Sequence, residues 1–338
     1  MTSYKVLEFY SGIGGMHWAL QGAGYHNTEV TAMEINDVAN RVYKTNFPSI
    51  KLLQRNITSL SINEFETWKP DMLLMSPPCQ PYTRVGLKRG TSDPRSFSFH
   101  HILDILGASK HKPNYFLLEN VKGFEEFGTE KLHATLRLCG YHFQEFLLSP
   151  HQFGIPNSRL RFYLLAKQNH LPFSFPVQSE IWTTMPLRKE SVATFKIGSI
   201  LDEEAAEDPT LLIPENILLK HADILDIVGP ESERSCCFTK AYSRFVEGTG
   251  SILCPLGLRK VEEVFKDMPG STEKITSLKS LKLRYFSPKE VSRLMSFPDE
   301  FCIPPSVTRK QAYQLLGNSI NVSVVSQLIK LLCKNDPG

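Results

Sequence analysis

The sequence predicts an α/β fold, in which an open sheet of buried strands alternates with helices and is followed by a small irregular domain. Three observations support this prediction. Short apolar runs recur up to Lys167, and the first of them, residues 5–9, leads into a glycine-rich turn at residues 12–15. Beyond residue 175, prolines and acidic runs such as residues 202–204 replace that regular alternation.

The composition is that of an ordinary soluble globular protein, because 41% of the 338 residues are hydrophobic and 22% are charged. No apolar run approaches the ~20 residues of a membrane span, and no basic and apolar leader precedes the first strand. We therefore expect a monomer without membrane contact, in the cytoplasm or also in the nucleus. Seven scattered cysteines without a C-x-x-C pair predict neither disulfides nor a metal site.

The first strand and turn resemble a nucleotide-binding cradle. Gly12, Gly14 and Gly15 allow a tight turn and a close approach of the backbone to a ligand. A dinucleotide fingerprint would need a further glycine where His17 stands, so a pyrophosphate-binding dehydrogenase is disfavoured. A second apolar strand, residues 30–33, ends in Glu34, an acid suited to a ribose diol. Each feature alone suits a purely structural turn equally well. Together they favour a nucleoside cofactor, with S-adenosylmethionine the commonest candidate.

The next segments continue the alternation. A helix is expected over residues 36–46, and residues 51–58 are expected to form a third strand and its exit loop, with residues 56–58 beside the adenine.

The apolar run at residues 71–75 predicts a fourth, buried strand. Pro77 and Pro78 end it and hold Cys79 in a fixed loop at the carboxyl end of the strand, where open α/β sheets have their active sites. Cys79 is therefore a candidate nucleophile, although a half-buried thiol in a turn is the ordinary alternative.

The loop after Cys79 is basic, since Arg84, Lys88, Arg89 and Arg95 face only Asp93. It suits a lid over phosphates, or equally a solvated surface loop. A helix is expected over residues 98–108, with its apolar residues facing inward.

Glu119 follows the apolar strand at residues 115–118, and burial would raise its pKa and make it a proton donor. The alternative is a helix cap. Further on, Arg159 and Arg161 enter another strand on one face, which suits an anionic or carbonyl-rich ligand or an internal ion pair.

The sequence predicts three regions: a catalytic domain at residues 1–175, an irregular recognition domain at 176–285, and a hinge with a C-terminal helix at 286–338 that completes the first domain. In the second region, residues 234–242 mix basic and aromatic side chains, as nucleic-acid-binding surfaces do. In the third, a helix should begin near Ser287, and the turn at residues 317–319 precedes an amphipathic helix.

In this order, the motifs resemble the cytosine-5 methyltransferase family over nearly the whole chain. The matching residues are Phe9 with Gly12, Gly14 and Gly15, then Glu34, Pro77–Gln80, Glu119–Val121, Arg159 with Arg161, and Gly317–Ser319. Tyr82 and Thr83, Asn56 and Asn157 depart from the residues that are frequent in the family.

The resemblance implies a Rossmann-like, S-adenosylmethionine-dependent methyltransferase with a mixed seven-stranded sheet and a small target-recognition domain. Catalytic residues would be Cys79, Glu119, Arg159 and Arg161. The cofactor, with S-adenosylhomocysteine as its product, would lie against Phe9, Gly12, Ile13, Gly14, Gly15, Glu34, Ile35, Ile57, Thr58, Ser76, Pro77, Asn318 and Ser319. Substrate contacts would come from Gln80, Arg84, Lys88, Arg234, Cys237, Phe238 and Thr239.

Within that family, the chain is similar to the compact branch that methylates transfer RNA, known for an anticodon-loop cytosine of aspartate tRNA. Two alternatives stay open: a DNA cytosine-5 methyltransferase that uses the same site, and a non-catalytic RNA-binding module that keeps the fold. An extruded base is least costly in a single-stranded loop, which favours an RNA hairpin over duplex DNA.

Overall fold

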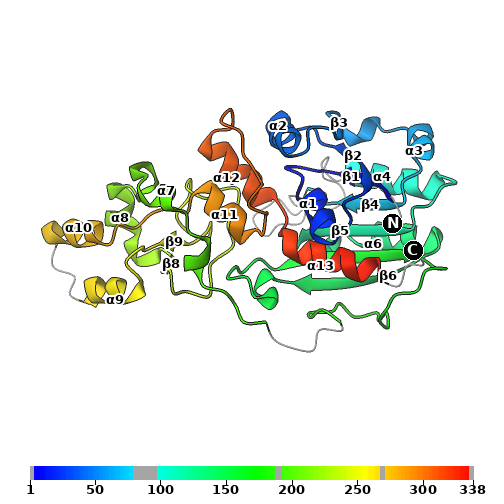
Figure 1. Ribbon diagram of the computed structural model, residues 1–338. Helices are drawn as coiled ribbons and strands as arrows, with labels where there is room; N and C mark the ends of the chain where they lie inside the picture. Colours follow the sequence, from blue (N-terminus) through cyan, green and yellow to red (C-terminus); the bar gives the residue numbers. More distant parts are fainter. Residues whose placement is uncertain (1–3, 79–96, 187–191, 267–270, 335–338) are drawn as a thin grey trace.

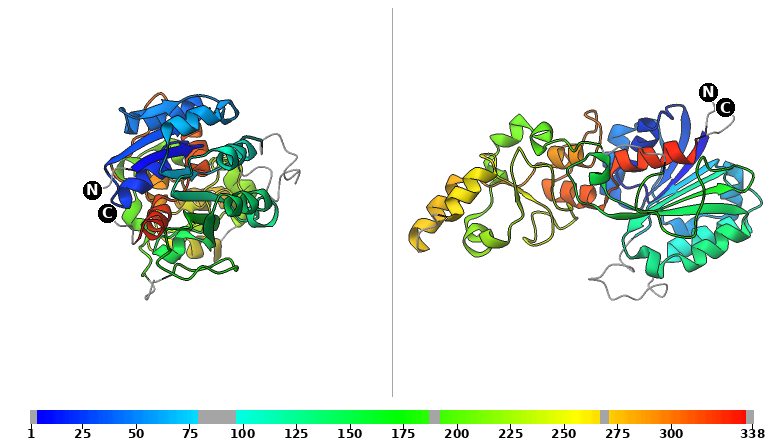
Figure 2. Two further views of the ribbon diagram at one scale, coloured as in Figure 1. Left: turned by 90° about the vertical axis from the view of Figure 1, so that its right-hand side faces the viewer. Right: turned by 90° about the horizontal axis from the view of Figure 1, so that it is seen from below.

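A computed structural model describes residues 4–78, 97–186, 192–266 and 271–334. The chain forms a large lobe around one sheet and a smaller lobe beside it, with part of the C-terminal region between them (Figure 1). Both termini lie at the far end of the large lobe (Figure 2). The predicted α/β class is confirmed.

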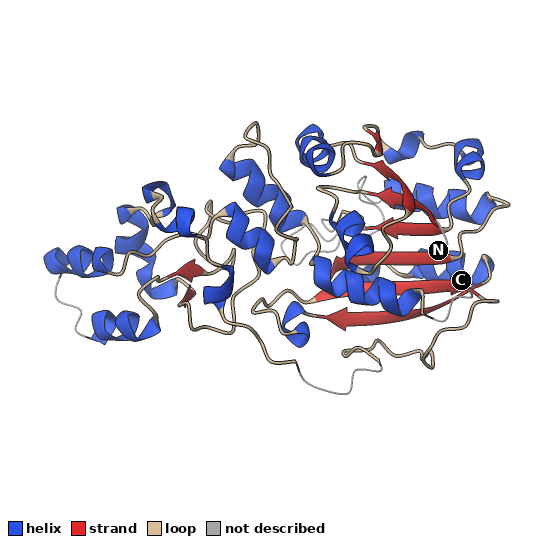
Figure 3. Cartoon of the chain, in the orientation of Figure 1, coloured by secondary structure: helices blue, strands red, loops and turns tan. Residues whose placement is uncertain are grey.

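The large lobe contains a seven-stranded sheet in the order β3-β2-β1-β4-β5-β7-β6. Pairings among β1 to β5 are parallel, whereas β7 runs antiparallel to both β5 and β6, so the sheet is mixed as expected (Figure 3). The strands are β1 (Tyr4–Phe9), β2 (Thr28–Met33), β3 (Lys51–Leu53), β4 (Met72–Met75), β5 (Tyr115–Val121), β6 (Tyr141–Leu148) and β7 (Arg161–Gln168).

Helices cover both faces of this sheet, which explains why its central strands read as continuous apolar runs. One core contains α1 and α13, and the other contains α3, α4 and α6. The helices of this lobe are α1 (Gly15–Gly22), α2 (Asp37–Asn46), α3 (Ile62–Trp68), α4 (Phe97–Ala108), α5 (Phe124–Phe127) and α6 (Glu130–Leu138), with short 3-10 turns η1 (Ile57–Ser59) and η4 (Pro150–Phe153).

The predicted elements agree with the structure to within a few residues, because local signals set their ends. The Asn36 side chain accepts hydrogen bonds from the amides of Val38 and Ala39 and so caps α2. Within the segment predicted as a third strand and its exit loop, β3 ends at Leu53, and Asn56 caps η1 in the loop.

The smaller lobe is irregular, as expected. It contains a two-stranded sheet, and its core includes Phe238, Tyr242 and Phe286. Its elements are η5 (Ile197–Ile200), α7 (Glu203–Ala206), η6 (Pro209–Leu211), α8 (Glu215–His221), η7 (Ala222–Ile224), β8 (Ile227–Val228), β9 (Ile252–Leu253), α9 (Leu258–Lys266) and α10 (Ser271–Ser280).

The segment just after residue 175 still belongs with the large lobe. The amide of Trp182 donates to Glu145 O at 3.0 Å, and the Trp182 carbonyl accepts from the Leu147 amide at 2.8 Å, so this stretch pairs with β6. The predicted boundary at 175 is therefore too early.

Three helices form the C-terminal region: α11 (Pro288–Leu294), α12 (Arg309–Asn318) and α13 (Val322–Leu332). A capping box of Ser287 and Glu290 starts α11. Helix α13 returns to the large lobe, where Ser326 Oγ donates to Ala19 O at 3.0 Å. Arg309–Leu332 is the one described segment long and apolar enough to span a membrane, but it contains two helices and 67% of its most apolar window is buried.

Candidate active site

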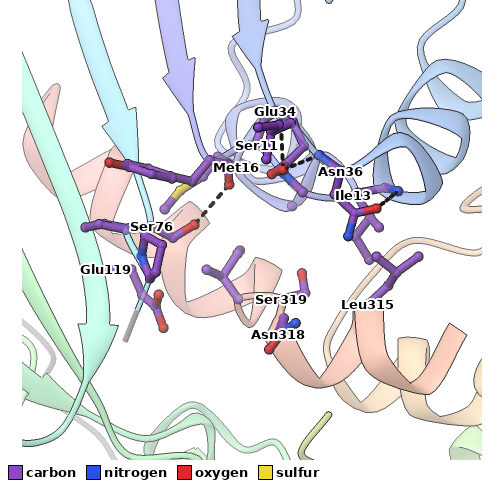
Figure 4. A pocket seen from close by; sticks show the side chains of 18 of the residues that line it. Ser11, Ile13, Met16, Glu34, Asn36, Ser76, Glu119, Leu315, Asn318 and Ser319 are labelled. Atoms are coloured by element: carbon purple, nitrogen blue, oxygen red, sulfur yellow. Dashed lines mark hydrogen bonds between the residues drawn. The ribbon is translucent and has the colours of Figure 1, made fainter. Parts of the chain in front are cut away.

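A cavity of about 520 Å³ lies at the carboxyl ends of the parallel strands. Glu34 and Asn36 lie on one side of it, Ser76 and Glu119 on the other, and Asn318 and Ser319 approach from the end of α12 (Figure 4). The cavity is thus lined by residues from the beginning, the middle and the end of the chain.

The glycine-rich turn shapes one wall of this cavity. Gly12 adopts a φ of +51°, and its amide donates to Glu34 Oε2 at 3.0 Å. A Cβ on Gly15, the first residue of α1, would lie 2.8 Å from the Ile320 side chain. These positions therefore need glycine, and their backbone faces the cavity.

Glu34 is fixed by the backbone at the end of β2. Its Oε1 accepts from the amides of Ile35 and Asn36, each at 2.8 Å, and its Oε2 accepts from Gly12. An ionised carboxylate has about four acceptor positions, so three backbone donors leave capacity for a ligand hydroxyl. This arrangement suits a ribose.

Another part of the cavity wall comes from η1. Ile57 and Thr58 line the cavity, and the Asn56 side-chain oxygen accepts from the Thr58 amide at 3.0 Å. Because that oxygen already caps η1, Asn56 would approach an adenine mainly through its amide nitrogen.

The cavity therefore fits a nucleoside cofactor such as S-adenosylmethionine. Of the residues expected to hold it, Gly12, Ile13, Gly15, Glu34, Ile35, Ile57, Thr58, Ser76, Pro77, Asn318 and Ser319 line the cavity. Phe9 and Gly14 do not, so their contact with the cofactor stays a prediction. Phe9 is fully buried in the core beneath, and Gly14 faces Tyr43 and Phe47.

The segment Ser76–Pro78 follows β4 and is tied to β5 by a hydrogen bond. We call this segment the proline seat. Asn120 Nδ2 donates to Pro77 O at 3.2 Å, and Asn120 Oδ1 accepts from the Val121 amide at 2.9 Å. Ser76 Oγ donates to Tyr10 O at 3.4 Å. These contacts fix the chain at Pro77 and Pro78, immediately before Cys79, which itself lies outside the described residues.

Glu119 ends the apolar part of β5 and faces the cavity. Burial raises the pKa of its carboxyl, and the positive charges of Arg161 and Arg159 oppose that rise only in part. Arg161 Nε lies 3.5 Å from Glu119 Oε1. The site thus places the Glu119 carboxyl, whose pKa is raised, beside the Arg161 guanidinium.

Arg159 makes buried hydrogen bonds to backbone groups beside the cavity. Its side chain is almost fully buried, and its Nη1 donates to Phe238 O at 3.1 Å while its Nη2 donates to Gly317 O at 3.1 Å and to Ser319 O. Three carbonyl oxygens and the Cys237 thiol therefore accept from its terminal nitrogens. Arg159 also lines the cavity, so its catalytic role beside Arg161 stays a prediction. In addition, Arg159 joins the smaller lobe to the end of α12.

The residues expected to contact the substrate lie in different surroundings. Gln80, Arg84 and Lys88 lie outside the described residues. Phe238 is 1% exposed and packs in the smaller lobe's core, so contact through its ring is wrong. Cys237 lies against Arg159 and Arg161, with its Sγ 3.4 Å from Arg159 Nη1. The Thr239 hydroxyl oxygen accepts from the Ala241 amide within its own turn. Arg234 does not line the cavity, and its Nη1 lies 2.8 Å from Asp226 Oδ1.

Three residues of this site were not among the residues predicted to form it. Lys240 lines the cavity from the smaller lobe, and Asn120 positions Pro77. Gly317 has no room for a side chain, because its Cβ would lie 2.2 Å from the backbone of Thr239 and Lys240. Asn120 and Gly317 stood within motifs that matched the family, and Lys240 stood within the basic and aromatic stretch at residues 234–242. Among the described residues, no group of three or more His, Cys, Asp or Glu side chains is placed to hold a metal ion.

The fold and the cavity define a Rossmann-like methyltransferase that uses S-adenosylmethionine. More specifically, the chain belongs to the family described as "C-5 cytosine-specific DNA methylase", whose sequence model matches residues 4–334. The family resemblance seen in the sequence is confirmed.

Individual relatives cover almost the whole chain. The tRNA (cytosine(38)-C(5))-methyltransferase of Spodoptera frugiperda is 44% identical, covering 98% of this chain and 99% of the relative. The DNA (cytosine-5)-methyltransferase of Dictyostelium discoideum is 38% identical, covering 98% and 95%. A crystal structure of a Spodoptera frugiperda DNMT2 mutant superposes with a TM-score of 0.88 at 43% identity, covering 98% of this chain and all of that one.

Proposed function

We propose that this protein transfers a methyl group from S-adenosylmethionine to C5 of a cytosine in tRNA. The observation that carries the proposal is the placement of Glu119 and Arg161 next to the Ser76–Pro78 seat, on the same cavity as Glu34. Relatives named as tRNA (cytosine(38)-C(5))-methyltransferases support the choice of substrate. We further propose the anticodon loop of aspartate tRNA as the target.

Glu34, Gly12 and the η1 residues would hold the nucleoside part of the cofactor. When bound, S-adenosylmethionine supplies an electrophilic methyl group on its sulfonium, and S-adenosylhomocysteine is the product. Ser76 and Pro77 line the same cavity as Glu34 and Glu119, so the methyl donor and the target base would meet beside them.

Activation of the base rests on Cys79 and Glu119. Addition of the Cys79 thiolate to C6 forms an S–C bond and moves the electron pair of the C5–C6 double bond toward C4 and N3. Glu119 gives its proton to N3, which takes up that electron density, and C5 becomes nucleophilic. Arg161 would bind O2 and offset its developing charge. After methylation, the C5 proton passes to solvent, the thiolate leaves C6 and N3 returns its proton to Glu119, which restores the aromatic ring.

Labelled S-adenosylmethionine with matched tRNA and DNA substrates tests this proposal. We expect label in tRNA, at one mapped cytosine, and a covalent complex with RNA that carries 5-fluorocytosine there. Cys79→Ala should abolish both signals. A non-catalytic RNA-binding module would instead show no transfer with the unmodified protein and retain its effect after Cys79→Ala.

DNA methylation is the second candidate, since the family model and the Dictyostelium discoideum relative both carry DNA in their names. Dominant label in DNA would establish it and overturn the tRNA proposal.

Cofactor binding can be measured separately by calorimetry with S-adenosylhomocysteine. Glu34→Ala should weaken binding strongly, because it removes the acceptor for the ribose hydroxyls. Glu29→Ala, an exposed residue of the same strand, is the matched control and should bind normally. Equal binding by the Glu34 and Glu29 variants would contradict the assignment of Glu34.

A further inference from the structure

A loop of the smaller lobe, residues 239–249, contributes Lys240 to the cavity lining. The Thr239 amide donates to Thr249 O at 2.9 Å and closes the loop at its base. The backbone of Thr239 and Lys240 lies directly against Gly317, and Lys240 lines the cavity. Any nucleotide strand that delivers a cytosine into the cavity would pass close to this loop.

The loop is held in one conformation by Tyr242. The Tyr242 ring is buried and lies edge-on to Phe238 and Tyr313, with centroids 4.8 Å and 5.0 Å away. Its hydroxyl donates to Ser251 O at 2.7 Å and accepts from the Phe286 amide at 2.9 Å. Side chains on the outer surface of the loop therefore start from a fixed backbone.

Three of those outer side chains are suited to nucleic acid. Phe245 is 63% exposed, and the guanidinium of Arg244 lies over its ring, 5.8 Å from the centroid. Lys240 and Arg244 are exposed, and neither forms an ion pair with another residue in the described parts of the chain. We call Lys240, Arg244 and Phe245 the loop platform.

The platform is close to the cavity because the loop is compact. The Phe245 amide donates to Ala241 O at 3.2 Å, which places Phe245 next to the residue that follows Lys240. The Phe245 carbonyl accepts from Thr249 Oγ1 at 2.8 Å and so is tied to the base of the loop. An isolated exposed phenylalanine is unremarkable on a protein surface. An exposed ring in contact with Arg244, in the same loop that contributes Lys240 to the cavity, is not.

Single-stranded nucleic acid is bound by aromatic rings that stack with bases and by cations that contact the phosphates. We propose that the loop platform binds a nucleotide that flanks the target cytosine, with its base stacked on Phe245 and its phosphates near Lys240 and Arg244. Such a contact is available only to an unpaired base, so it would help select a single-stranded loop. This inference rests on the proposed RNA substrate.

The test combines variants of the full chain with anticodon stem-loop RNAs in which single nucleotides on either side of the target cytosine are abasic. Phe245→Ala should weaken RNA binding about tenfold, as loss of one stacked base does. Phe245→Tyr should bind normally because it keeps the ring. Leu219→Ala, at an exposed apolar residue of α8, is the control and should also bind normally.

A double-mutant cycle identifies the stacked base. One flanking abasic position should weaken wild-type binding as much as Phe245→Ala does, and the two changes together should cost no more than either alone. Normal binding by Phe245→Ala, or additive losses at every abasic position, would overturn the platform. Methyl transfer to tRNA without this coupling overturns the platform alone. Coupling without any transfer by the wild type overturns the proposed reaction and supports the platform. A wild-type protein that does not bind the RNA overturns both.

Discussion

Arg159 donates from Nη2 to the carbonyl oxygen of Gly317 at 3.1 Å, and this contact joins two residues 158 positions apart. The same guanidinium reaches Phe238 O in the smaller lobe. One buried cation thus connects the segment before β7, Phe238 of the smaller lobe and the end of α12. The cavity wall formed by Asn318 and Ser319 depends on that connection.

Arg159→Lys should lower the free energy of unfolding by about 2–4 kcal/mol, because one ammonium cannot reach the carbonyl groups that the guanidinium satisfies. Arg161→Lys is the matched comparison. It keeps a positive charge near Glu119 and should lower kcat about 100-fold with a smaller loss of stability. Thermal melting and methyl-transfer rates, measured on both variants, check this contrast. A stable Arg159→Lys protein would contradict the connecting role.

Glu119→Gln should lower kcat/KM by about 10²–10⁴-fold, since glutamine fills the same space but has no acidic proton. Burial raises the pKa of Glu119, and the reaction needs the protonated form. Wild-type kcat/KM should therefore fall as the pH rises through that elevated pKa. The residual activity of Glu119→Gln should lack this decline. A pH profile with the same decline in both proteins would assign it to another group.

Gly317→Ala should destabilise the protein and separate Thr239 from α12, because the added Cβ would lie 2.2 Å from backbone atoms that cannot move freely. Gly107→Ala is the control. Gly107 lies within α4, its Cβ would meet nothing within 4 Å, and alanine there should stabilise the helix by about 0.5–1 kcal/mol. Denaturant unfolding compares the two changes. A neutral Gly317→Ala variant would show that the two backbones are not so closely packed.

Glu8→Gln should make the protein more stable at alkaline pH. Glu8 lies on β1 and is fully buried, Tyr43 Oη donates to its Oε2 at 2.6 Å, and burial raises its pKa to about 8. The folded state therefore holds the proton more tightly than the unfolded state. The stability that Glu8 contributes is complete below its ordinary pKa of 4.5 and is lost as the pH rises through about 8.

The difference in melting temperature, wild type minus Glu8→Gln at the same pH, should consequently decrease as the pH rises from 4.5 to 8. Glu29→Gln, at an exposed residue of β2, should show no such trend. A constant difference between wild type and Glu8→Gln across this pH range would contradict the buried, proton-retaining carboxyl.

Local patterns were sufficient for the sheet and for much of the candidate site. Apolar runs defined the strands because both faces of the sheet are covered, and the glycine-rich turn, Glu34, the proline seat and Glu119 each follow a strand directly. Since the carboxyl ends of parallel strands share one edge of the sheet, their order in the chain already placed them together.

Contacts between distant segments were decided only by the tertiary structure. The residues Arg159 and Arg161 look equivalent at strand spacing, yet one donates to carbonyl groups from two other regions and the other faces Glu119. Phe238 and Phe245 look alike in a basic and aromatic stretch, but one fills the lobe's core and the other is exposed. The physical reason is that a side chain's role depends on the groups packed around it, and those groups come from parts of the chain that folding alone brings together.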